Sequence, residues 1–309
     1  MPDRAVNDKP LNLPFLTDLV CRAVRSAGDI LMQGFGGSHG WIATQEDRAH
    51  GNLASRWDRL SEEAIVGCLL AECREALSHE PVALISEEAK APRIASPASG
   101  KTGFQVHETD DLSGWTGYTW AVDPLCGSIN YMRGLPDFAV SAALLKGTEI
   151  ILGAVLDPVR GELFHAAEGR GAFLNGKPIR PSTVSRLDES YVTLEDRILR
   201  EIAPDELARL VRSVFRVRIA GSCGKEMCYV AAGRTDALVK IHQPLYDYAA
   251  GAVILREALP GAAGLTALDG SGALAPSLSF RRDAGFLATN GLLHKALSAF
   301  TSRWRLSAE

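Results

Sequence analysis

The order of helical and strand-like patterns along the chain is the feature that most constrains its fold. Apolar residues recur at helical spacing over residues 15–35, where glycines follow, and again over residues 59–77. Stretches of strand length, most of them bounded by Gly or Pro, follow at residues 82–85, 118–123, 139–145, 150–156 and 162–167. The last three, separated by Gly-rich turns, predict a meandering sheet.

Beyond Pro181 the pattern changes to helices and strands in alternation. Helices are predicted at residues 204–214, 222–232, 247–258 and 292–303, and strands at 215–219, 237–241, 265–268 and 285–289. Each helix must bury its apolar face against a sheet, so this alternation favours a layered arrangement. The sequence therefore predicts an α/β (α+β) fold.

The chain divides into a few segments of different composition. Residues 1–14 are a polar arm without the apolar core and cleavage site of a secretory signal. Residues 15–184 are predicted to form an N-terminal α+β half and residues 185–309 a C-terminal α/β half of one compact unit. Residues 89–117 are rich in Pro, Ser, Gly, Thr and Asp, which predicts a long irregular loop or flap.

Composition and charge exclude several classes of protein. With 46% hydrophobic and 23% charged residues, the chain is typical of a globular protein. The net charge of -4 and the lack of a long basic run argue against nucleic-acid binding, and no apolar run is long enough to cross a membrane. The 6 cysteines lack zinc-site and redox-motif spacing, which predicts a reduced, cytoplasmic protein.

Acidic residues stand where predicted strands end or predicted helices begin. Glu87 and Glu88 follow one strand, Asp123 ends another, and Asp247 opens a helix. Strand ends are where layered α/β proteins build their sites, although an acidic residue at a helix start is often only a cap. Any one of these positions is therefore weak evidence for a site.

Together, the residues around these positions resemble a known family. The segments are Ile85-Ser-Glu-Glu88, Asp123-Pro-Leu-Cys-Gly-Ser128 with Asn130, Gly153-Ala-Val-Leu-Asp-Pro158 and Tyr246-Asp-Tyr-Ala-Ala-Gly251. In order and spacing they resemble the inositol monophosphatase family of metal-dependent, lithium-sensitive phosphatases, from about Leu16 to the C-terminal helix.

The resemblance implies a fold, a metal site and an assembly. The fold is a layered αβαβα sandwich of the inositol monophosphatase and fructose-1,6-bisphosphatase type, and family members are commonly homodimers. The implied Mg²⁺ ligands are Glu87, Asp123, the carbonyl of Leu125 and Asp247, oxygen donors of the kind that Mg²⁺ prefers. The substrate would be a small phosphorylated molecule.

The resemblance also implies catalytic roles. Water would attack a phosphomonoester in line, with one metal activating the water and another stabilising the leaving oxygen. Gly127 and Ser128 would bind the phosphate, and Ser128, backed by Asp58, would orient the water together with Glu87. The segment that carries Asp58 departs from the family pattern, with Asn52 where an Asp is usual and Arg56 and Trp57 crowding the approach.

Cys126 is the largest departure, because the family carries a metal-binding aspartate there. A thiol, mostly protonated at neutral pH with a reference pKa of about 8.5, is a poor ligand for a hard cation. We therefore expect fewer Mg²⁺ ions than in a typical member, or none. Alternatively, Cys126 at a helix start has a lowered pKa and acts as a nucleophile.

Three further residues bear on the substrate. Ile129 replaces a second hydroxyl beside Ser128, and Lys240 lies where inositol-cleaving members place a substrate-binding Glu. Lys240 would suit a substrate with an additional negative charge, or it is an exposed lysine at a strand end. His242 and Tyr246 precede Asp247 closely enough to contact substrate, although a surface or core role is the default.

Three functions remain open at this stage. The first is Mg²⁺-dependent hydrolysis of a small phosphorylated metabolite other than inositol phosphate. The second is a phosphatase scaffold repurposed for non-hydrolytic chemistry such as cyclisation or elimination. The third is a family member that binds a ligand without catalysis.

Overall fold

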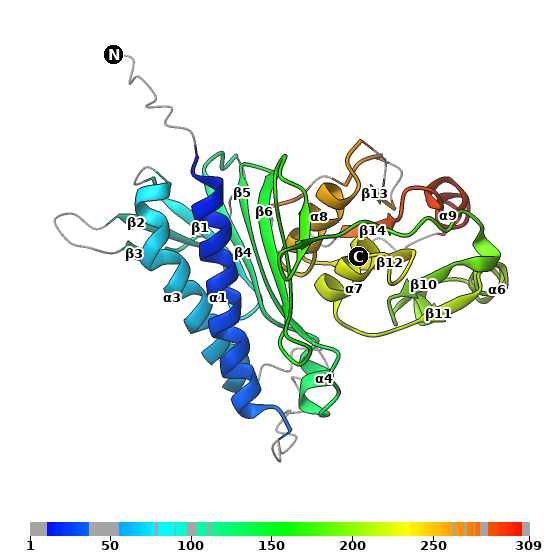
Figure 1. The fold of residues 1–309 in the computed structure, drawn as a ribbon, viewed down its shortest axis with the longest axis horizontal. Coiled ribbons are helices and arrows are strands. Elements are labelled where there is room, and N and C mark those ends of the chain that lie inside the picture. The colour runs from blue at the N-terminus through cyan, green and yellow to red at the C-terminus, as the bar shows by residue number, and fades with distance from the viewer. Residues whose placement is uncertain are drawn as a thin grey trace.

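The computed structural model describes residues 11–36, 56–77, 80–89, 91–97, 104–109, 112, 114–261, 264–268, 271–274, 276–278 and 284–304. Within these residues the chain forms five layers, which run from left to right in Figure 1: helices, a sheet, helices, a second sheet and helices. The layered α/β fold predicted from the sequence is confirmed.

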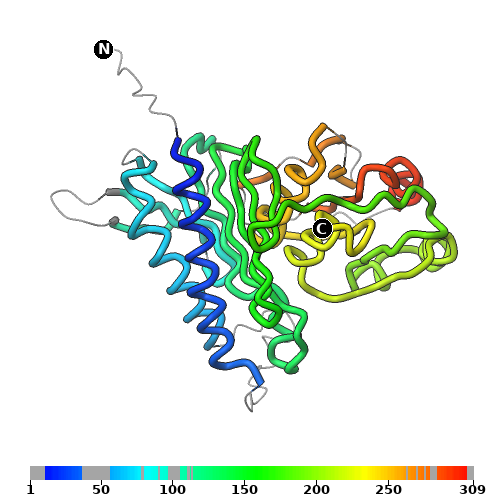
Figure 2. The backbone as a smooth tube through the Cα atoms, viewed as in Figure 1, coloured from blue at the N-terminus to red at the C-terminus, as the bar shows by residue number. Residues whose placement is uncertain are grey.

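The first layer consists of two long helices, α1 (Leu13–Gly34) and α3 (Arg56–Ala76). Helix α1 starts inside the predicted N-terminal arm, because Asn12 Oδ1 accepts a hydrogen bond from the Phe15 amide at 3.2 Å and Pro14 suits a first turn. Its apolar stripe is fully buried on α3 and the first sheet. Figure 2 shows the two helices side by side.

The first sheet has the strand order β3-β2-β1-β4-β5-β6-β7-β8-β9. Its strands are β1 (Val82–Ser86), β2 (Arg93–Pro97), β3 (Phe104–Glu108), β4 (Tyr118–Cys126), β5 (Ala139–Lys146), β6 (Glu149–Asp157), β7 (Glu162–Ala167), β8 (Ala172–Leu174) and β9 (Lys177–Pro178). The meander of β5, β6 and β7 is the one predicted from the sequence. Only β1 and β4 pair in parallel, so their carboxyl ends lie at the same edge.

The prediction of an irregular loop over residues 89–117 is wrong in part. Strands β2 and β3 form an antiparallel pair there, and β2 also pairs with β1. The physical reason is that β1 would otherwise present an unpaired strand edge, whose backbone groups β2 satisfies. Backbone pairing of this kind depends little on the Pro- and Ser-rich composition that suggested a loop.

The middle layer consists of α7 (Cys223–Ala231) and α8 (Leu245–Ala258), which lie between the two sheets. Both helices are buried along nearly all of their length, as expected for helices covered by a sheet on each face. Helix α8 lies directly on β6, where a Cβ at Gly153 would be 2.8 Å from the Ala250 Cα. This close packing fixes the position of α8, and with it Asp247 in its first turn.

The second sheet has the order β11-β10-β12-β14-β13 and is covered by the last helical layer. Its strands are β10 (Tyr191–Leu194), β11 (Arg216–Arg218), β12 (Ala237–Gln243), β13 (Leu265–Ala267) and β14 (Ala284–Thr289). The helices outside it are α5 (Ile198–Glu201), α6 (Pro204–Ser213) and α9 (His294–Thr301); a 3-10 turn lies at Leu187–Glu189 and the short α4 at Ser128–Met132. No helix in the described ranges is long and apolar enough to span a membrane.

Candidate active site

Three carboxylates from three separate elements approach one another at the edge where β1 and β4 end. Glu87 follows the last residue of β1, Asp123 lies in the second half of β4, and Asp247 lies in the first turn of α8. Parallel pairing aligns the ends of β1 and β4, and α8 packs on β4. We call Glu87, Asp123 and Asp247 the acid cluster.

The surroundings of the acid cluster disfavour the ionised form of its carboxyl groups. Burial raises the pKa of Glu87 well above its ordinary value, and the charges of Asp123, Asp247 and Asp58 raise it further. Burial likewise raises the pKa of Asp123, with Cys126 and Asp247 as the next causes. Like charges held together in a poorly hydrated place favour either protonation or a bound cation.

Asp123 is the most constrained member of the cluster. It is fully buried, and its Oδ1 accepts a hydrogen bond from the Leu125 amide at 3.1 Å. Its Oδ2 is also buried and has no hydrogen-bond partner among the described residues. A buried carboxylate oxygen without a donor is costly, so it calls for a ligand that supplies positive charge.

The donor set fits Mg²⁺ in kind, because carboxylate oxygens are hard ligands and one of them lacks any donor. As they stand, however, no three acidic, thiol or imidazole side chains of the described residues lie close enough to hold one ion. An ion bound here would have to draw the carboxylates closer together. Glu87, Asp123 and Asp247 are the residues that would hold it.

Cys126 ends β4 opposite Ala139 and is buried, with 5% of its surface exposed. Burial raises the pKa of its thiol to about 12, and the neighbouring Asp247 and Cys223 contribute in the same direction. The thiol is therefore neutral at physiological pH. This contradicts the alternative that Cys126 is a nucleophile with a lowered pKa, because desolvation outweighs any effect of the five-residue α4.

Ser128 lies between two acceptors at the start of α4. Its Oγ donates to Asp58 Oδ1 at 3.3 Å and to the Leu125 carbonyl at 3.0 Å, so one hydroxyl proton is shared between them. Asp58 is fully buried in the first turn of α3. Ser61, one turn further on, donates to the Pro124 carbonyl at 2.7 Å and so ties α3 to the end of β4.

The structure also places the residues around Asp58. Trp57 packs against α1, since a Cβ at Gly34 would come within 2.2 Å of its ring. Its side chain therefore contributes to the helical layer. Asn52 lies outside the described residues.

Gly127 can only be glycine at its place. It adopts a φ of +102°, and a Cβ would lie 2.9 Å from the Asp137 carbonyl and 3.0 Å from the Gly221 carbonyl. Asn130, two residues into α4, donates from Nδ2 to the carbonyls of Asp137 and Ala220, each at 2.7 Å. Gly127 and Asn130 therefore join segments of both halves of the chain around the predicted phosphate-binding residues.

Lys240 is a buried lysine. The alternative that it is an exposed lysine at a strand end is wrong. It is 4% exposed, and its Nζ lies 2.7 Å from Glu226 Oε2. Burial alone would lower its pKa, but the Glu226 carboxylate outweighs burial and raises the pKa. Glu226 Oε1 accepts from the amides of Ala220 and Gly221 at 3.0 and 3.2 Å, so the pair supports the loop that contacts Gly127.

A second group of buried charges, which the sequence did not single out, lies beside the same loops. Lys225 is 1% exposed, and its Nζ lies 3.2 Å from Asp137 Oδ1 and 3.2 Å from Asp157 Oδ2. Arg160 also pairs with Asp157, at 2.8 Å. We call Lys225, Asp137, Asp157 and Arg160 the lysine network; only Asp157 lies in a segment that the sequence analysis quoted, and no shared motif connected the four residues.

The structure places the remaining candidate substrate contacts near the same end of α8. The Nε2 of His242, which is half-buried, lies 3.0 Å from Glu201 Oε2 of α5. Tyr246 is half-buried, and its carbonyl accepts a hydrogen bond from Ser141 at 3.4 Å. Contact of either residue with a substrate stays a prediction.

Comparisons with known proteins agree with the fold described above. Over 247 residues the chain is 35% identical to inositol monophosphatase 2 of Solanum lycopersicum, covering 78% of this chain and 84% of that protein. It superposes on an inositol monophosphatase of Thermotoga maritima with a TM-score of 0.69 at 27% identity, covering 92% and 96% of the two chains. The SuhB protein of Bartonella henselae shares the fold, with a TM-score of 0.71 at 23% identity and coverage of 94% and 99%.

The family model of the inositol monophosphatase family matches residues 13–300 of this chain. Members of this family are phosphatases that typically use Mg²⁺ and act on small phosphorylated substrates. The match spans all five layers and every member of the acid cluster. The chain belongs to the inositol monophosphatase family.

Proposed function

We propose that this protein hydrolyses a small phosphomonoester in a Mg²⁺-dependent reaction, with fewer ions than a typical family member. The observation that carries the proposal is Asp123, a fully buried carboxylate whose Oδ2 has no well-aligned donor among the described residues, held among the like charges of the acid cluster. A cluster that is costly without a cation is consistent with a site that functions with one.

The residues of this chain would divide the work as follows. Glu87, Asp123 and Asp247, with the Leu125 carbonyl, would hold the ion, which supplies Lewis-acid stabilisation to the phosphoryl oxygens when bound. Gly127 and Ser128 would receive the phosphate through backbone amides. Ser128, held by buried Asp58 at 3.3 Å, would orient the attacking water through its hydroxyl.

Cys126 is the reason we expect the site to bind Mg²⁺ weakly. Its neutral thiol adds no negative charge beside Asp123, so the position that a second ion would need is poorly provided for. Hydrolysis would then rest mainly on the ion held by the acid cluster. We expect a higher Mg²⁺ requirement than a chain with a carboxylate at this position would show.

The substrate we propose is a phosphorylated metabolite other than inositol phosphate. Ile129, beside Ser128, is 56% exposed and presents apolar surface where a polyol would need hydrogen bonds. The Lys240 ammonium is paired with Glu226, which disfavours a direct role in substrate charge recognition. A substrate with fewer hydroxyl groups than inositol would fit the surroundings of Ser128 and Ile129 better.

Phosphate release from a panel of phosphomonoesters, measured across a Mg²⁺ titration, tests this function. The comparison is between the natural chain and Cys126→Asp, with Cys68→Asp as a charge-matched control on α3. We expect Mg²⁺-dependent release from the natural chain, and from Cys126→Asp at lower Mg²⁺ concentration. The control should behave as the natural chain does.

Other results would contradict the proposal. Activity in Cys126→Asp alone would mean a disabled site and favour ligand binding without catalysis. Turnover of an unphosphorylated substrate that persists in a chelator would favour a scaffold repurposed for cyclisation or elimination. No phosphate release from either chain at any Mg²⁺ concentration would overturn phosphatase function altogether.

Assembly and location belong to the same proposal. We propose a cytoplasmic homodimer, in keeping with the family resemblance, built from one compact unit per chain. Sedimentation velocity measures the assembly directly, and a single monomeric species across protein concentrations would contradict it.

A further inference from the structure

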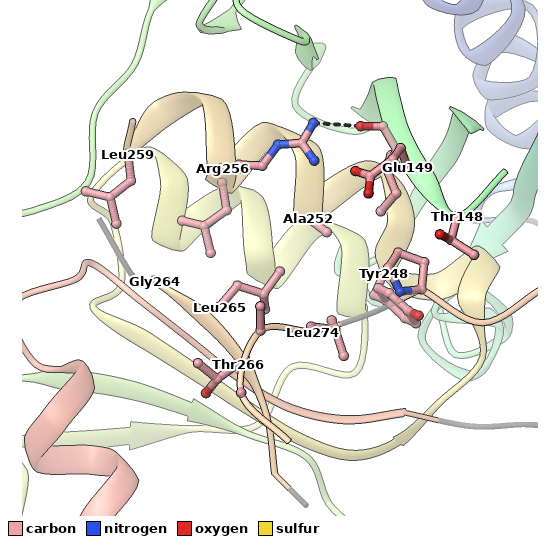
Figure 3. Close-up of a pocket in the computed structure, with 15 residues that line it drawn as sticks. Thr148, Glu149, Tyr248, Ala252, Arg256, Leu259, Gly264, Leu265, Thr266 and Leu274 are labelled. Atoms are coloured by element: carbon pink, nitrogen blue, oxygen red, sulfur yellow. Dashed lines mark hydrogen bonds between the residues drawn. The ribbon is translucent and has the colours of Figure 1, made fainter. Parts of the chain in front are cut away.

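A pocket of about 580 Å³ lies against α8, and none of its lining residues belongs to the candidate active site. Helix α8 forms one wall from Tyr248 to Arg256, with Leu259 just beyond its end; β13 forms another wall, and residues 272–274 and Pro276 close a third side. Figure 3 shows these walls facing one another across the pocket. The volume lies in the range of roughly 300–1,000 Å³ that small-molecule sites occupy.

The interior of the pocket is mostly apolar. Its apolar lining consists of Ile150, Tyr248, Ala252, Leu255, Leu259, Leu265, Ala273, Leu274 and Pro276. Ala252 lies midway along the helical wall and is small, so the helix leaves room there for a ring or chain. A molecule that removed this surface from water would gain binding energy from burial of apolar area.

The polar groups of the pocket are balanced or already bonded. Arg256 and Glu149, one positive and one negative residue, lie on the same side of the pocket, across from Leu265 and Thr266. Arg256 Nη2 donates to the Ile150 carbonyl at 2.6 Å, and Thr266 Oγ1 is hydrogen-bonded to His294 Nε2 at 3.0 Å. Such a lining offers no net charge to attract an ion, so it favours an uncharged occupant.

We propose that this pocket binds a small, uncharged and largely apolar molecule of one or two rings, separately from the phosphatase site. Tyr248 contributes an aromatic side chain to one end, and ring-shaped ligands pack well against aromatic side chains. Thr148 and Glu149, which are exposed to solvent and line the pocket, could offer a hydrogen bond to its occupant.

A fluorescence titration with N-phenyl-1-naphthylamine tests this site on the full chain. This uncharged two-ring amine brightens in apolar surroundings, and we expect saturable binding of one molecule per chain. Ala252→Phe, which fills the pocket from α8, should weaken binding about tenfold or more, equivalent to at least 1.4 kcal/mol. Ser26→Phe, on the exposed face of α1, is the matched control and should leave binding unchanged.

Two further arms keep the test decisive. Leu274→Asp places a charge in the pocket from a loop, without crowding a helix, and should also weaken binding; it decides the matter if near-ultraviolet circular dichroism shows Ala252→Phe misfolded. The anionic 8-anilinonaphthalene-1-sulfonate should bind more weakly than the uncharged probe. No saturable binding, undiminished binding in both pocket variants, or tighter binding of the anion would overturn the proposal.

Discussion

The acid cluster and the lysine network are two groups of buried charges that the same chain treats in opposite ways. In the lysine network, the Lys225 ammonium has acceptors in Asp137, Asp157 and the Pro136 carbonyl, all within 3.2 Å. In the acid cluster, no ammonium or guanidinium pairs with the buried Asp123 carboxylate among the described residues, and its Oδ2 has no hydrogen-bond partner of good geometry there. One group is complete as it stands and the other is not.

The difference separates structure from function. A buried charge with its partners in place holds elements together, and removing a partner leaves a costly uncompensated charge. A buried carboxylate kept without a partner weakens the fold, and such groups concentrate at functional sites. Removing charge should therefore destabilise the lysine network but leave the acid cluster folded and inactive.

The largest effect is expected from a substitution at Asp123, which tests the acid cluster's part in the comparison. Asp123→Asn keeps the shape and the acceptor for the Leu125 amide but removes the charge. We expect phosphate release to fall on the order of a hundredfold or more, because a Lewis-acid position is worth several kcal/mol. The melting temperature without Mg²⁺ should stay the same or rise, and a marked fall in it would contradict the comparison.

Lys225→Met is the opposite experiment. Asp157 is fully buried, and among the cations of the described residues only the half-exposed Arg160 would still pair with it. We expect a loss of about 3 kcal/mol in unfolding free energy, measured by urea denaturation. Arg200→Met, which breaks an exposed pair with Asp196, is the control and should cost about 0.5 kcal/mol or less. Equal losses in the two variants would show that the network contributes no more than a surface pair.

Gly127→Ala sharpens the comparison at the loop between the two groups. An alanine at a φ of +102° is strained, and its Cβ would approach the Asp137 and Gly221 carbonyls. We expect a loss of about 2 kcal/mol in unfolding free energy and reduced phosphate release. Gly134→Ala, at a φ of +70° with open space around the Cβ, carries the backbone strain alone and should cost less. Equal costs would mean that the close approach at Gly127 is unimportant.

For a change of one pH unit, the pH dependence of stability is the smallest effect. Because Glu87 and Asp123 have raised pKa values in the folded state, the folded protein binds more protons than the unfolded one above about pH 4. Unfolding free energy without Mg²⁺ should therefore fall as pH rises from there, by up to about 1 kcal/mol per pH unit for Asp123.

The same urea series includes its own controls. Asp123→Asn and added Mg²⁺ should each flatten the fall, the first by removing a titrating group and the second by favouring the ionised form. Glu88 adds to the fall up to about pH 7, since burial first and then Asp58 and Glu62 raise its pKa to about 7. Stability that rises with pH over this range would contradict the raised pKa values.

Much of the fold could be predicted from periodicity. The apolar spacing of α1 and the Gly-separated strands β5, β6 and β7 each carry their own signal, and the structure confirms them. The hairpin of β2 and β3 could not be predicted in this way, because it forms on the open edge of β1, a property of the sheet. Strand β10, only four residues long, lacks the length for a periodic signal.

The candidate site, like the fold, could be predicted from the sequence only in part. The positions of Glu87, Asp123 and Asp247 at element ends were visible in the sequence, and the family resemblance connected them. The environment of each side chain was not visible. Lys240 looked like a strand-end lysine, but α7 lies on β12 and brings Glu226 against it, so burial and pairing depend on tertiary packing.

Calorimetric titration of Mg²⁺ into the natural chain, with Asp123→Asn as the comparison, tests the central claim most directly. The claim is that the acid cluster is incomplete because a cation completes it. We predict saturable binding by the natural chain at millimolar Mg²⁺ or below, with proton release where binding displaces protons from Glu87 and Asp123. Asp123→Asn should bind far more weakly. No binding by the natural chain, or equal binding by both, would contradict the claim.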